Sequence, residues 1–141
     1  MSERLTENLL DELFFSRSLD SFLEAPEVQP QPSLAEYLAQ LLAAKGMRRS
    51  DVIRLSGLNT TFAYQAFSGE RIPSRDKLLQ LAIGLDLNIK ETQRLLRIGD
   101  AGALYCKVRR DAIVLYCLDR HMTLEETEQT LYQFGEKTLT Q

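Results

Sequence analysis

The sequence holds few of the residues that build disulfides, metal sites or histidine-based catalysis. Its 141 residues include two cysteines, one histidine and no tryptophan. Cys106 and Cys117 stand too far apart for a CxxC redox pair and are too few for a zinc ribbon, so we expect two reduced thiols, with Cys117 buried. A single histidine, His121, argues against a histidine-based triad and a His-rich metal site. We therefore expect no catalytic site, no cofactor and no metal, in a protein that is not an enzyme.

Long apolar runs are also missing. The longest spans residues 112–118, whereas a helix that crosses a bilayer needs about 20 apolar residues. The first twelve residues carry five charged side chains with no apolar stretch between them, unlike a secretory signal. These absences predict a cytoplasmic protein that does not contact a membrane.

Signals for β-strands are absent as well. No segment of useful length alternates apolar and polar residues, and no Asn-Gly or Asp-Gly pair indicates a hairpin. Apolar residues instead recur at helical spacing along most of the chain. The sequence therefore predicts an all-α fold.

Capping residues divide residues 33–98 into five short helices. Ser33 with Glu36, and Asn88 with Glu91, have the spacing of a capping box, in which two side chains satisfy the first N–H groups of a helix. Glycines such as Gly46 are typical of helix ends. The expected helices run from Ser33 to Gly46, over residues 50–56, from Asn59 to Gly69, from Pro73-Ser74 through Ala82, and from Asn88 to Ile98.

An acidic amphipathic stretch precedes these helices. Within residues 6–23, apolar side chains fall on one helical face, and prolines between residues 26 and 32 then predict an extended linker. The apolar face packs either on the body of its own chain or on a partner. We expect three parts: an arm with its linker (1–32), a helical domain (33–100) and a C-terminal extension (101–141).

Charge is unevenly divided between these parts. Residues 1–33 hold seven acidic and two basic residues, whereas residues 34–100 hold ten basic and seven acidic ones. The whole chain has a formal net charge of −3. Nucleic acid is polyanionic, so a DNA-binding face would have to lie in the middle part.

The C-terminal part repeats the pattern of the fourth and fifth helices after 35 residues. The shift places Arg75-Asp76 on Arg110-Asp111, and apolar positions meet apolar positions without a gap. Thr123 takes the place of Asn88 as a helix cap. The repeat predicts a second helical hairpin over residues 110–134, with Arg110 and Asp111 pairing locally at a helix start.

The stretch from Lys45 to Ser74 joins two short helices at Gly57, where a residue without Cβ can adopt positive φ. Ile53 before the turn faces the small Ala63 and Ala66 after it, as two crossing helices require. Phe67 is expected in the core, and the sequence does not decide whether Phe62 is buried or exposed.

With the Ser68-Gly69-x-Arg71-x-Pro73-Ser74 exit and the Leu-Leu-x-Leu-Ala helix that follows, residues 34–98 resemble the Cro/repressor-type (XRE-like) helix-turn-helix family. The resemblance implies a five-helix repressor-like domain. Here it is flanked by an N-terminal amphipathic helix and a C-terminal helical hairpin. It further implies a bacterial transcription regulator that binds double-stranded DNA as a homodimer.

The same resemblance implies which residues meet DNA. The helix of residues 59–68 would lie in the major groove, with Gln65 reading bases one turn from its start. Arg49 would grip phosphate at the start of the preceding helix, and Tyr64 would touch sugar or base. The implied DNA-binding residues are Arg48, Arg49, Thr60, Thr61, Tyr64, Gln65, Ser68 and Arg71.

A second hypothesis comes from the aromatic residues of that helix. Phe62 and Tyr64 are large and apolar for a DNA-facing surface and suit a protein surface as well. The chain would then be a protein-interaction module, of the adaptor or antitoxin kind. On either hypothesis, residues 6–23 or 110–134 are the expected sites of contact with a further protein.

Overall fold

A computed structural model describes residues 9–11, 19–24 and 30–140, and the regular structure of these residues is entirely helical. The predicted all-α class is confirmed. The chain divides into two units, residues 1–31 and 32–141. In the first unit, α2 (Leu19–Leu23) exposes Leu19 and Leu23; most of the predicted amphipathic stretch lies outside the described residues. Within the described ranges, no helix is both long enough and apolar enough to cross a membrane.

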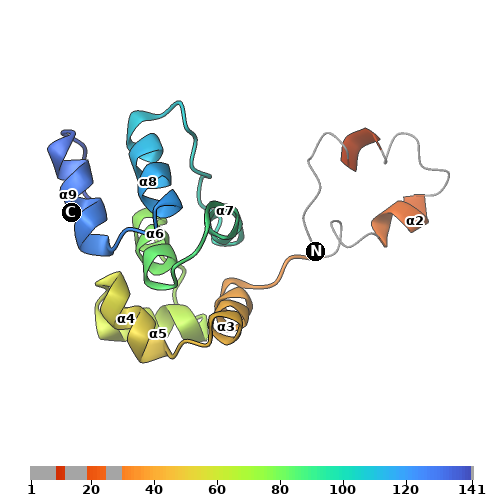
Figure 1. Cartoon of the computed structure of the whole chain (residues 1–141). Helices are drawn as coiled ribbons and strands as arrows, with labels where there is room; N and C mark the ends of the chain where they lie inside the picture. The colour runs from red at the N-terminus through yellow and green to blue at the C-terminus, as the bar shows by residue number, and fades with distance from the viewer. Residues whose placement is uncertain (1–8, 12–18, 25–29, 141) are drawn as a thin grey trace. The chain divides into compact units, whose positions relative to one another are not determined.

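Five helices follow in the second unit, close to the predicted positions (Figure 1). Both N-cap bonds form: Ser33 Oγ accepts a hydrogen bond from the Glu36 N–H, and Asn88 Oδ1 from the Glu91 N–H, at 3.2 and 2.8 Å. The full capping box forms at Asn88 and Glu91, whereas at Ser33 only this half of it does. Such caps satisfy N–H groups that the helix itself leaves without acceptors. The helices are α3 (Leu34–Lys45), α4 (Arg49–Ser56), α5 (Thr60–Ser68), α6 (Arg75–Gly84) and α7 (Ile89–Ile98).

Helix α6 lies at the centre of this unit. Leu78, Leu79 and Leu81 are buried in one apolar core with side chains of the surrounding helices. Helix α4 approaches α6 closely at Gly84. A Cβ at this position would stand only 2.8 Å from the Val52 carbonyl oxygen. The amide of Gln80 donates to the Ser56 carbonyl at 3.0 Å. The end of α4 is thereby fixed, and with it the start of the turn to α5.

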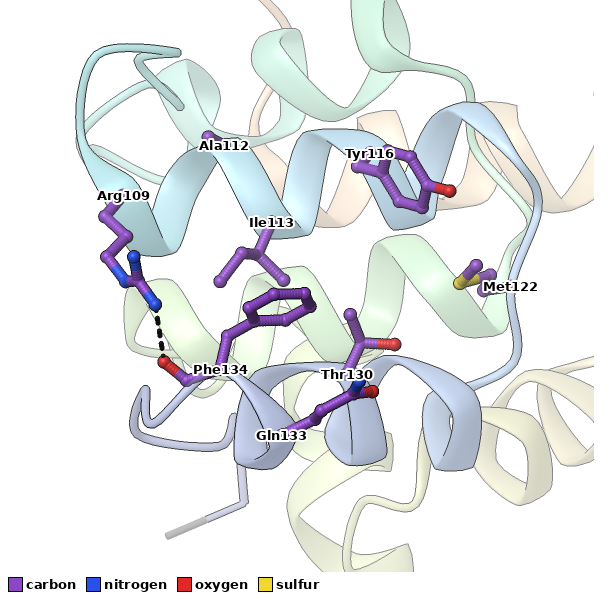
Figure 2. Close-up of a pocket in the computed structure, with 8 residues that line it drawn as sticks. All are labelled: Arg109, Ala112, Ile113, Tyr116, Met122, Thr130, Gln133 and Phe134. Carbon is purple, nitrogen blue, oxygen red and sulfur yellow. Dashed lines mark hydrogen bonds between the residues drawn. The ribbon is translucent and has the colours of Figure 1, made fainter.

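The predicted second hairpin is formed by α8 (Arg109–Asp119) and α9 (Leu124–Gln133), which lie beside each other (Figure 2). Thr123 and Glu126 make the predicted capping box. The turn contains His121 at φ +53°, and the turn between α6 and α7 contains Asp86 at the same angle. These two equivalent residues also meet, with His121 Nδ1 2.9 Å from Asp86 Oδ1.

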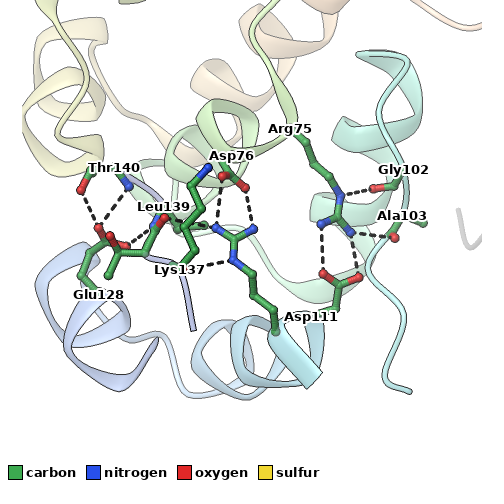
Figure 3. A network of polar contacts seen from close by, with 11 residues as sticks. Arg75, Asp76, Gly102, Ala103, Asp111, Glu128, Lys137, Leu139 and Thr140 are labelled. Atoms are coloured by element: carbon green, nitrogen blue, oxygen red, sulfur yellow. Dashed lines mark hydrogen bonds and ion pairs between the residues drawn. The ribbon is translucent and has the colours of Figure 1, made fainter. Parts of the chain in front are cut away.

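Two arginines join the hairpins reciprocally (Figure 3). Arg75 donates two hydrogen bonds to the Asp111 carboxylate at 2.8 and 3.0 Å, and Arg110 donates two to Asp76 at 2.9 and 3.1 Å. The prediction that Arg110 and Asp111 pair locally was wrong. Both find their partners on the other hairpin, because α6 and α8 begin side by side.

Each repeat continues into a tail that returns along its own helices. Arg75 also donates to the carbonyls of Gly102 and Ala103, and Arg110 to those of residues 137 and 138, which stand 35 residues later. Each contact made by the first repeat to the second is matched by the equivalent contact of the second repeat to the first. The same reciprocity is found in an isologous interface between two subunits. The repeat of the sequence is thus a repeat of the structure, related by a pseudo-two-fold arrangement.

The pKa of Asp111 reflects these contacts. Burial is the largest influence and would raise it, but the guanidinium of Arg75 and the N–H of Tyr105 hydrogen-bond the carboxylate. Together with the nearby charge of Arg110 they hold the pKa of Asp111 below its usual value. Asp111 therefore stays ionised in the folded protein.

We expect Asp111→Asn to lower the free energy of unfolding by about 2–3 kcal/mol at pH 7, because it leaves the guanidinium of Arg75 without its carboxylate. Urea denaturation measures the difference. The control is Asp119→Asn, which removes an exposed carboxylate at the other end of the same helix and should change stability by less than about 0.5 kcal/mol. Equal losses in the two variants would contradict the structural role of the pair.

The stability difference between the wild-type protein and Asp111→Asn should depend on pH. The folded pKa is depressed, so the carboxylate contributes fully above the unfolded pKa of about 4. That contribution is lost as the pH falls through the lower, folded value. Urea denaturation of both proteins at a series of acidic pH values tests this, and a difference that stays constant to the lowest pH would speak against it.

Candidate nucleic-acid interface

The turn between α4 and α5 is built around Gly57, which has φ +68° as the sequence predicts. The buried Ser56 Oγ donates to the Ile53 carbonyl and accepts a hydrogen bond from the Leu58 N–H, at 3.0 and 3.4 Å. Asn59 Oδ1 then accepts from the Phe62 N–H at 3.1 Å and begins α5. Local hydrogen bonds thus fix the angle at which α5 leaves α4.

Helix α5 has one buried face and one open face. Ala63, Ala66 and Phe67 are buried, so Phe67 lies in the core as predicted. The opposite face carries the residue types that can contact bases or phosphates, since their spacing places them together on a helix. Thr60, Thr61, Tyr64 and Ser68 are exposed there, and Gln65 is half-buried.

Basic residues lie beside two rings of α5, Phe67 near its end and Phe62 near its start. The guanidinium of Arg49, in the first turn of α4, lies 5.9 Å from the centre of the Phe67 ring, and that of Arg71, after α5, lies 5.8 Å from the Phe62 ring. Arg48 is exposed, and its guanidinium stands 3.6 Å from the Asp51 carboxylate. Exposed ion pairs of this kind are weak, so Arg48 can exchange this partner for another anion.

The structure adds one residue that the sequence reasoning missed. The ammonium of Lys77 lies 5.1 Å from the centre of the Phe62 ring, on which Arg71 also lies. Phe62, left open from the sequence, is a half-buried platform for two cations. The available signal was the place of Lys77 in the first turn of α6, directly after the loop that carries Arg71.

The two thiols behave as predicted. Cys117 is buried and Cys106 exposed, and both are free. Burial, the largest influence, raises the pKa of the Cys117 thiol and makes it a poor nucleophile. In the part of the chain that the structure describes, no group of three or more His, Cys, Asp or Glu side chains could hold a metal ion.

Comparisons with known proteins return no match: neither a protein-family model nor a curated protein nor a solved structure is similar to this chain.

We expect substitutions on the open face of α5 to leave the fold intact. Thr61→Ala and Arg71→Ala remove exposed side chains and should change the free energy of unfolding by no more than about 0.5 kcal/mol. Ala63→Leu, on the buried face of the same helix, should cost about 1–3 kcal/mol because no space exists for the added atoms. Urea denaturation ranks the three variants; a large loss for Thr61→Ala would show that this face supports the fold.

Proposed function

We propose that this protein is a sequence-specific DNA-binding transcription regulator that places α5 in the major groove. One observation carries the proposal: hydroxyl and amide side chains cluster on the open face of α5, and two arginines lie beside the Phe67 and Phe62 rings of the same helix. An α-helix fits the major groove, and such side chains can read the donors and acceptors of base edges there. Arginines at the margins supply the phosphate contacts that set register.

The chemistry of each position follows from its side chain. Gln65 can make a paired hydrogen bond to adenine, and Thr60 and Thr61 can offer either a hydroxyl or a methyl group to bases at the start of α5. Arg49 lies in the first turn of α4, where the helix dipole and N–H groups also attract a phosphate. Arg71 and Lys77, which both lie over the Phe62 ring, form a second positive point beside the first turn of α5.

A single short helix contacts few base pairs, so specific binding would require two copies. We propose a homodimer on a site with two-fold symmetry, with half-sites about 34 Å apart along the duplex. The basic residues on each copy are few, and doubling them gives affinity with a modest dependence on salt.

The second hypothesis, a protein-interaction module, has less support. Tyr64 remains exposed as that hypothesis needs. Phe62, however, lies beneath two cations and is not a free apolar contact. A partner protein would have to displace these charges before it could use the ring.

Arg49→Ala should weaken DNA binding to all sequences by a similar factor and lower the salt slope by about one, because it removes one phosphate contact. The control is Lys107→Ala, which removes a positive charge from the segment between α7 and α8, far from α5 in Figure 1. Fluorescence anisotropy at several salt concentrations measures both. If the two variants lose affinity equally, the cause is general charge and Arg49 has no specific role.

Gln65→Ala should relax specificity at one base pair, with a cost of about 1–3 kcal/mol for the preferred site and little for other sequences. Gln40→Ala, on the exposed side of α3, is the matched control and should bind like the wild-type protein. A selection of genomic fragments followed by binding to single-base variants of the site gives both values. If the wild-type protein binds no fragment even at low salt, while Tyr64→Ala abolishes capture of a protein, the second hypothesis replaces the first.

A further inference from the structure

The outer side of the α8–α9 hairpin carries an apolar groove of about 610 Å³. Figure 2 shows Ile113 and Phe134 turned toward each other between the two helices, with Tyr116 and Met122 toward the other end. Tyr116 is 49% exposed and Phe134 50%. The guanidinium of Arg120 lies 3.6 Å from the centre of the Tyr116 ring, so a partner that covers this ring displaces that guanidinium. Exposed rings over a groove of this size are typical of a surface that a partner covers.

The internal repeat identifies what kind of partner fits. A shift of 35 residues places Ile113, Tyr116 and Met122 on Leu78, Leu81 and Leu87. These three leucines are at most 1% exposed. The groove is therefore the open counterpart of a surface that is covered in the first hairpin.

Helix α3 packs against α7 of the first hairpin, and its apolar side chains share one core with these three leucines. The Tyr37 hydroxyl donates to the Glu91 carbonyl at 3.3 Å, and Arg94 lies 5.1 Å from the centre of the Tyr37 ring. At the end of α3, Lys45 donates to the Glu91 carboxylate and to the Asp86 carbonyl, at 3.1 and 3.3 Å. The first hairpin thus binds an amphipathic helix of about three turns that ends in a cation.

The second hairpin retains the polar groups that received this helix. Glu126 takes the place of Glu91 and makes the same cap hydrogen bonds, while the turn around His121 takes the place of the turn around Asp86. A helix that docks in the groove would therefore carry apolar residues at the spacing of α3 and a basic residue in its last turn.

The sequence of the N-terminal arm has this pattern. In α3 the apolar residues are Tyr37, Leu38, Leu41 and Leu42, followed by Lys45. In the arm, at the same spacing, they are Leu9, Leu10, Leu13 and Phe14, followed by Arg17. The arm is otherwise acidic. Arg109 and Arg120, which begin and follow α8, are paired with Glu136 and Asp119 at 3.2 and 3.7 Å. Exposed ion pairs are weak, so both arginines can exchange these partners for carboxylates of the arm.

We propose that the α8–α9 groove of one copy binds residues 9–17 of a second copy, in the manner in which α3 packs against α7 and the turn before it. The exchange is reciprocal, so two grooves and two arms make a closed symmetric dimer. The choice of a second copy as partner rests on the proposed function, which needs a dimer. The groove and its repeat relation do not rest on that function.

The test measures the mass of the full chain by sedimentation equilibrium. The wild-type protein should dimerise, and Leu13→Asp in the arm or Tyr116→Glu in the groove should each weaken the dimer at least about tenfold, because each puts a charge into an apolar contact. The control is Tyr132→Glu on α9, which alters a side chain that is 78% exposed and does not line the groove; this variant should dimerise normally.

Mixing the two variants distinguishes exchange between copies from other forms of association. The Leu13→Asp copy keeps an intact groove and the Tyr116→Glu copy an intact arm, so the mixture should form heterodimers although neither variant pairs with itself. A labelled peptide of residues 5–18 should also bind the Leu13→Asp protein, and a scrambled peptide should not. Circular dichroism of each variant verifies that it remains folded.

Several outcomes would overturn the inference. They are a monomeric wild-type chain, a dimer that Leu13→Asp leaves unchanged, and a mixture that gains no heterodimer. These are separable from the failure of the proposed function. A chain that dimerises through its arm but binds no DNA would remove the function and keep the inference. A chain that binds DNA as a dimer, and whose dimer neither variant weakens, would keep the proposed function and remove the inference.

Discussion

The reciprocal pairs Arg75–Asp111 and Arg110–Asp76 organise the C-terminal half of this protein. Each guanidinium uses one edge for a carboxylate on the other hairpin and its remaining N–H groups for carbonyls of its own tail. One side chain therefore connects its own helix, its own tail and the other hairpin. Because the arrangement is the same in both directions, each hairpin contributes the same kind of contact to the other.

The tails show how the repeat closes. The Gln93 amide donates to the carbonyl of Leu104 and accepts from its N–H, and the Glu128 carboxylate accepts from the N–H of Leu139, which stands 35 residues after Leu104. Both leucines are buried. In each repeat a polar side chain thus binds the backbone of a buried leucine in the tail. The polar side chain is Gln93 in the first repeat and Glu128 in the second.

Helix positions followed from the sequence because caps are local. Ser33, Asn59, Asn88 and Thr123 each bind an N–H three residues later, and such pairs can be identified without knowing the rest of the fold. The residues expected on the open face of α5 came from the resemblance to the helix-turn-helix family. The partners of Asp111 and the position of Lys77 over Phe62 did not, because both depend on segments that meet only after folding. The repeat of an adjacent Arg-Asp pair could be seen in the sequence. Adjacent Arg and Asp are equally consistent with a local ion pair at the start of a helix, so the sequence did not show that the pairs join two hairpins.

The turn at Gly57 also touches the second hairpin. A Cβ at this position would stand 2.5 Å from Cδ2 of Leu124, the first residue of α9. A side chain there would meet two separate obstacles: a left-handed backbone and an occupied neighbouring space. The turn between α4 and α5 thus packs directly against the start of α9, so the C-terminal hairpin contacts the segment that orients α5.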